Sequence, residues 1–76
     1  MKAHSYTVQI EPVKEGGFWS RVPALPGCFS QGETIEETIV NTKEAIELYL
    51  EGLTAGKEDI PEESEGIVSV RIPVSV

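Results

Sequence analysis

The feature that most constrains this chain is its single amphipathic helix pattern, which begins at residue 34. Thr34 and Glu37 have the capping-box spacing, in which each side chain can satisfy a backbone amide at the start of a helix. Gly56 is placed to end the helix in a left-handed cap. Residues that can face a sheet recur at steps of three and four, namely Ile35, Ile39, Thr42, Ile46, Tyr49 and Leu53. One helix over residues 35–53 can cover only one face of a sheet, so the pattern predicts a sheet with an open face.

The residues before this helix predict an antiparallel meander of three strands. Residues 5–13 alternate between apolar and polar side chains, as expected for a strand with one buried face. Gly16-Gly17 permits a tight hairpin turn, so residues 18–23 are expected to return beside the first strand. After a break rich in proline and glycine, residues 28–31 form a short third strand.

The residues after the helix predict a loop and a fourth strand. Residues 57–66 are polar and acidic, whereas residues 67–76 are rich in valine and isoleucine. Because a strand–helix–strand crossover is right-handed, the last strand should lie parallel to the first, in the spatial order 3-2-1-4. We therefore predict an α+β fold of the order β-β-β-α-β: an antiparallel meander plus one parallel edge strand, covered on one face by a single helix. Residues 1–76 are expected to form one domain.

The charge of the chain limits the partners that it can bind. Thirteen acidic residues against six basic ones give a net charge of −7, and the basic residues are scattered singly. This argues against direct binding of nucleic acid and suits a basic partner or simple solubility. The single cysteine fits a reducing cytosol, and no apolar run reaches the ~20 residues that span a bilayer. A cytoplasmic protein without a membrane segment is expected.

Residue patterns of catalysis are mostly missing. His4, the only histidine, lies in the N-terminal segment, and Cys28 is expected to be a small packing residue. The predicted order is also the first part of the ribonuclease H fold, in which a two-metal site needs three or four converging carboxylates. The first strand offers only Glu11 for such a site, and a solvated helix face is the simpler reading of Glu36, Glu44, Glu47 and Glu51. We expect no enzyme, no metal and no cofactor, although Glu11 meeting the helix carboxylates around a metal stays an open alternative.

Several motifs together resemble a known family. They are Gly16-Gly17-Phe18-Trp19, Leu25-Pro26-Gly27-Cys28 within residues 22–37, and the helix segment 43–53. In combination they resemble the HicB-like antitoxin family over nearly the whole chain, although each alone is explained as a turn or a helix end. The resemblance implies a partial ribonuclease H-like domain that lacks nuclease chemistry. Such a domain would neutralise a small basic HicA-type toxin, a ribonuclease that cleaves mRNA.

Two departures from the family pattern affect this expectation. Ala24 replaces the acidic residue that usually precedes Leu-Pro-Gly, which weakens any role of that carboxylate. No C-terminal DNA-binding module follows the predicted last strand, so control of an operon is not expected. A rival hypothesis is therefore an orphan oligomeric scaffold or ligand-binding module of uncharacterised function.

The open sheet face and the last strand are the predicted interaction sites. Phe18, Trp19 and Arg21 are the candidates for binding a partner, since aromatic residues and arginine dominate binding hot spots. Partial burial of Trp19 under a neighbouring loop is an equal alternative. A thin core and an apolar edge strand favour a homo-oligomer, a dimer or a tetramer. The candidates for self-association are Val68, Val70 and Ile72.

Overall fold

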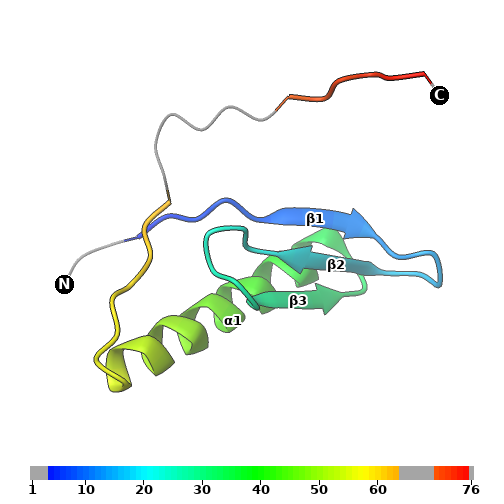
Figure 1. Cartoon of the computed structure of the whole chain (residues 1–76). Helices are drawn as coiled ribbons and strands as arrows, with labels where there is room; N and C mark the ends of the chain where they lie inside the picture. The colour runs from blue at the N-terminus through cyan, green and yellow to red at the C-terminus, as the bar shows by residue number, and fades with distance from the viewer. Residues whose placement is uncertain (1–3, 64–69, 76) are drawn as a thin grey trace.

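A three-stranded antiparallel sheet packed on one long helix makes up the fold (Figure 1). The computed structural model describes residues 4–63 and 70–75. The elements in chain order are β1 (Gln9–Pro12), β2 (Phe18–Arg21), β3 (Phe29–Gly32) and α1 (Ile35–Ala55). The strands lie in the order β1-β2-β3, with β2 in the centre. This confirms the α+β class and the antiparallel meander.

The strands are shorter than the sequence predicts. The strand predicted over residues 5–13 is only four residues long, Gln9–Pro12, and its pairing with β2 ends where Gln9 lies opposite Arg21. Two positions before Gln9 the residue opposite would be Pro23, which has no N–H to donate. The hairpin turn between β1 and β2 lies where predicted, with Gly16 and Gly17 at φ values of 113° and 78°. β3 starts and ends one residue later than predicted.

The ends of α1 match the prediction at one side and differ at the other. At the start, the Thr34 hydroxyl accepts a hydrogen bond of 3.0 Å from the Glu37 amide, as the capping-box pattern predicts. At the end, the left-handed cap at Gly56 is wrong, because Gly56 has φ −83°. The Gly56 amide still donates to the Gly52 carbonyl, as in a helix. The left-handed backbone conformation comes one residue later, at Lys57 with φ 57°.

The buried face of α1 agrees only in part with the face that the apolar spacing predicts. Thr42 is buried and Ile46, Tyr49 and Leu53 are half-buried, as expected, but the first turns of the helix differ. Ile35 and Ile39 are about half exposed, at 48% and 53%, whereas Thr38 and Thr42 are fully buried. The Thr42 hydroxyl donates to the Thr38 carbonyl and lies 2.5 Å from the hydroxyl of Ser20 on β2. The Thr38 hydroxyl donates to the Thr34 carbonyl, so these small side chains let the helix approach the sheet closely without leaving a buried hydroxyl unpaired. Close approach therefore decides the helix face.

The core is formed around the loop that connects β2 and β3, residues 22–28, whose apolar side chains point inward. Its fully buried apolar residues are Val22, Leu25 and Cys28. The Leu25 amide donates to the Val22 carbonyl, and the Cys28 amide donates to the Leu25 carbonyl, which folds this loop inward. Burial raises the pKa of the Cys28 thiol, so Cys28 is a packing residue as expected. The partly buried residues around this core are Tyr6, Val8, Ala45, Ile46, Tyr49 and Leu50.

The predicted fourth strand is not seen in the part of the chain that the structure describes. Residues 70–75 form an extended segment apart from the sheet, without strand pairing (Figure 1). Residues 67–69 and 76, the rest of that predicted strand, lie outside the described residues. The order 3-2-1-4 is therefore not shown, because β1 has no neighbour on its outer side among the described residues. The alternation of residues along this segment is typical of a strand. It does not show which other strand, distant in the sequence, the segment would pair with.

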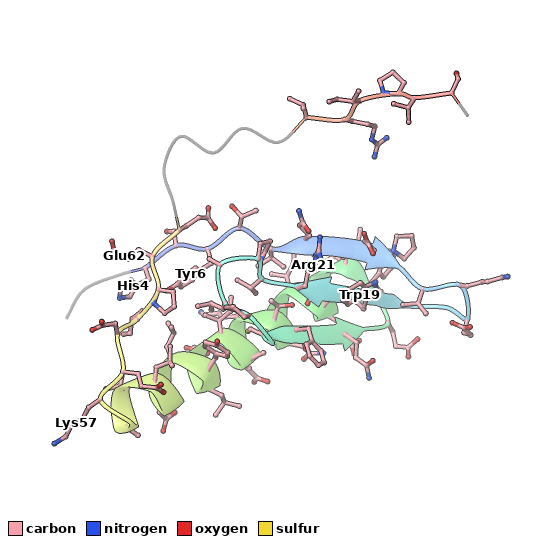
Figure 2. The ribbon with its side chains drawn as sticks, viewed as in Figure 1. His4, Tyr6, Trp19, Arg21, Lys57 and Glu62 are labelled. Atoms are coloured by element: carbon pink, nitrogen blue, oxygen red, sulfur yellow. The ribbon has the colours of Figure 1, made fainter. Side chains whose placement is uncertain are left out.

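The chain after α1 returns to the residues that lead into β1. The Tyr6 hydroxyl donates to the Pro61 carbonyl at 2.6 Å, and the Thr7 amide and hydroxyl both donate to the Glu63 carboxylate. His4 and Tyr6 stack beside this returning segment, close to Glu62 in Figure 2. Burial, together with the charges of Glu62 and Glu63, raises the pKa of Tyr6. The returning segment is thus tethered at the free side of the sheet.

The Glu63 tether should weaken in acid. Both Thr7 hydrogen bonds favour the ionised carboxylate and lower the pKa of Glu63 below its ordinary value. The tether is therefore intact above that ordinary value and is lost as the pH falls through the lowered pKa. In an NMR titration, we expect the Thr7 amide to shift with a midpoint below that of a free glutamate. Replacing Thr7→Ala should move the midpoint of the Glu63 carboxyl back upward, and an unshifted midpoint in the wild type would contradict the tether.

Candidate protein interface

The sheet face turned away from α1 carries two rows of side chains. Strand alternation places Trp19 and Arg21 on this face, because Ser20 between them is buried against the helix. The register then aligns each of them with one residue on either neighbouring strand. The six residues, which we call the open face, are Gln9, Arg21 and Phe29 in one row and Glu11, Trp19 and Gln31 in the other.

Hydrogen bonds across the strands hold the polar residues of the open face. The Trp19 indole N–H donates to Oε2 of Glu11 at 3.1 Å, and the Arg21 Nε–H donates to Oε1 of Gln9 at 2.7 Å. Figure 2 shows that Trp19 and Arg21 both project from the same strand, β2. Side chains held in place before binding lose less conformational entropy when a partner arrives. The open face is therefore partly preorganised.

Two aromatic rings on the open face are accessible. Phe29 is 66% exposed and Trp19 is 36% exposed. The indole of Trp19 lies across the sheet toward Glu11, which leaves about a third of this side chain accessible. Sequence reasoning missed Phe29. Its neighbour Cys28 is an apolar residue expected inside, so alternation along the third strand could have placed Phe29 outside.

The three predicted partner-binding residues do not share one surface. Trp19 and Arg21 lie together on the open face. Phe18 lies on the opposite face of the sheet, opposite Pro12 and Gly32 in the register, beside a pocket that Asn41 of α1 also lines. It is half-buried there. Because side chains alternate along β2, Phe18 points to the same side as Ser20, toward α1, and away from Trp19.

The described residues offer little for metal or membrane chemistry. Within residues 4–63 and 70–75, no group of three histidine, cysteine or acidic side chains is placed to hold a metal ion. Glu11 accepts a hydrogen bond from Trp19 rather than meeting the helix carboxylates. The only helix of the described ranges, α1, is too polar for a membrane-spanning segment.

These features define a small α+β domain whose uncovered sheet face carries aromatic and arginine side chains, a composition typical of protein-binding surfaces. The family model described as HicB-like antitoxin of bacterial toxin–antitoxin systems matches residues 6–71. The chain therefore belongs to the HicB-like antitoxin family. Membership in this family points to a toxin–antitoxin role with a toxin as the kind of partner, and to a protein that is not an enzyme.

Relatives in distant organisms share most of the chain. The UPF0150 protein ssr1765 of Synechocystis sp. is 48% identical over 60 residues, covering 79% of this chain and 76% of that protein. The UPF0150 protein Ta0767 of Thermoplasma acidophilum is 45% identical over 65 residues, covering 86% of this chain and 94% of that protein. An uncharacterised 14.9 kDa protein of Haemophilus phage HP1 is 45% identical over 56 residues, covering 74% of this chain and 41% of the phage protein.

Proposed function

We propose that this chain is an antitoxin that binds a small basic HicA-type toxin and stops it from cleaving mRNA. The family membership carries the proposal, since it defines the kind of partner. The open face supports it with two accessible aromatic rings and an arginine, the residue types that dominate binding hot spots.

The charge of the chain supports the same proposal. A net charge of −7 attracts a basic partner and speeds its encounter with the domain. The acidic side chains of α1 are mostly exposed, whereas the open face itself carries one acid and one base. We therefore expect the net charge to set the association rate and the aromatic side chains to set how long the complex lasts.

The test is binding and inhibition with a HicA-type toxin encoded beside this chain. We expect a stable complex and loss of RNA cleavage. The double substitution Trp19→Ala with Phe29→Ala should weaken binding by about 30-fold or more, the effect of about 2 kcal/mol that one hot spot supplies. Leu48→Ala is the matched control, because Leu48 is 69% exposed on α1, away from the open face. Isothermal titration calorimetry measures all three affinities.

Two results would contradict the proposal in different ways. Absence of any complex, with RNA cleavage unchanged, would leave the orphan scaffold as the better hypothesis. A complex that the Trp19 and Phe29 substitutions leave at wild-type affinity would retain the antitoxin role but reject the open face as its site. A folded far-UV circular dichroism spectrum for every variant excludes a trivial loss of structure.

A further inference from the structure

A groove on the second flank of α1 is open, and apolar side chains line most of it, with His4, Lys43 and Glu47 among them. The first flank carries Asn41, whose side chain donates to the Gln31 carbonyl of β3 at 2.7 Å. The opposite flank lies below the residues that lead into β1. The side chains that line the groove there are His4, Tyr6, Ile39, Lys43, Ile46, Glu47 and Leu50. The sheet leaves this flank of α1 uncovered, and Ile39 stays 53% exposed.

Glu63 binds Thr7 just before β1, but the outer edge of β1 itself is free among the described residues. β1 pairs with β2 on one side only. An edge strand carries backbone donors and acceptors that a further strand can use. A strand laid along β1 would therefore gain hydrogen bonds from the sheet and apolar contacts from α1.

A segment of the same chain has the properties that this place requires. Val70, Ile72 and Val74 are 71%, 72% and 81% exposed, and they alternate with Arg71, Pro73 and Ser75. In a strand, side chains of alternate residues lie on one face and their backbone groups point to one edge. Val70, Ile72 and Val74 could thus pair with β1 and cover the groove, while Pro73 leaves its missing donor on the outer edge.

We propose that residues 70–75 of a second copy fill this groove, and that the exchange is reciprocal. Glu63 is tethered to Thr7 just before β1, yet residues 70–75 stand apart from the sheet and from α1 in this chain (Figure 1). Each copy therefore exposes both an apolar segment and an apolar groove. A two-fold exchange covers both at once and closes the assembly as a dimer. The proposal is independent of the toxin.

Sedimentation of the full chain at micromolar concentration tests the association. We expect about twice the monomer mass of 8.3 kDa. Ile72→Glu and, separately, Ile39→Glu should each weaken the dimer about tenfold or more, because each places a charge in the buried contact. Leu48→Glu, on an exposed part of α1 outside the groove, should leave the mass unchanged. Ile72 lies outside the core, so its variant is expected to keep the helical circular dichroism of the wild type.

Cross-linking tests where the segment binds. Ile39→Cys chains mixed with Ile72→Cys chains should form a disulfide-linked pair upon oxidation, since the two introduced thiols can meet only between copies. The native thiol of Cys28 is buried and does not compete. A monomer in sedimentation would overturn the proposal. So would a dimer that neither glutamate variant weakens, or a chain carrying both cysteine substitutions that forms the disulfide only within itself.

Discussion

Replacing Leu25→Ala is expected to remove a large part of the stability of this domain. Leu25 is fully buried at the centre of the loop core, between Val22 and Cys28. Truncation of a buried leucine costs about 2–5 kcal/mol, because apolar contacts are lost and a cavity remains. A chain of this size has a total stability of about 4–11 kcal/mol at 0.05–0.15 kcal/mol per residue. The variant should therefore unfold at a much lower urea concentration or be unfolded without urea.

The control for this prediction is the same substitution at the surface. Leu48 is 69% exposed on α1, and alanine is at least as good a helix former as leucine. Leu48→Ala should change the free energy of unfolding by less than about 0.5 kcal/mol. Urea unfolding followed by circular dichroism measures both variants at one protein concentration, because the self-association proposed above would make stability depend on concentration. Equal effects of the two substitutions would show that the loop is not the core.

Local patterns predicted the parts of the fold that depend on neighbouring residues. The start of α1 is set by Thr34 and Glu37, which lie three residues apart. The first hairpin is set by two adjacent glycines with positive φ. Such signals need no knowledge of the rest of the chain, and both are confirmed by the structure.

Features that depend on distant contacts were predicted less well. Apolar spacing placed Ile35, Ile39 and Thr42 on the buried face. Thr42 is buried, but Ile35 and Ile39 are about half exposed and Thr38 is buried in their place. The buried hydroxyl of Thr42 has its partner in Ser20, which lies 22 positions earlier in the chain. The same holds for the predicted last strand. Its own residues do not determine whether it pairs, because pairing also depends on a free strand edge elsewhere in a chain.

The candidate interface was half predictable for the same reason. Alternation along one strand places Trp19 and Arg21 together and excludes Phe18 from their side. Alternation along the third strand indicates that Phe29 lies outside, but only the pairing of Arg21 with Phe29 shows that it lies next to them. The register depends on the length and shape of the loop between the two strands. The proline and glycine residues predicted that a break lies there, but not the path of the loop.

Replacing Gly32→Ala is expected to separate α1 from β3. A Cβ atom at Gly32 would lie 2.7 Å from the Thr38 amide nitrogen and 2.8 Å from the Thr38 hydroxyl. The first of these atoms belongs to the helix backbone and cannot move alone. Its displacement also strains the hydrogen bonds by which the Thr38 amide and hydroxyl donate to the Thr34 carbonyl, at 2.9 Å and 2.7 Å. Overpacking of this kind costs about 1–3 kcal/mol.

Gly52→Ala provides a matched control with the opposite expected sign. Gly52 lies within α1, is exposed, and a Cβ atom there would meet nothing within 4 Å. Alanine in an exposed helix position is favoured over glycine by about 0.5–1 kcal/mol, so this variant should be more stable than the wild type. The two variants differ only in position, and urea unfolding should move their midpoints in opposite directions. Stabilisation by both substitutions would show that Gly32 is not held against the helix, and that the close contact of sheet and helix does not set the buried face of α1.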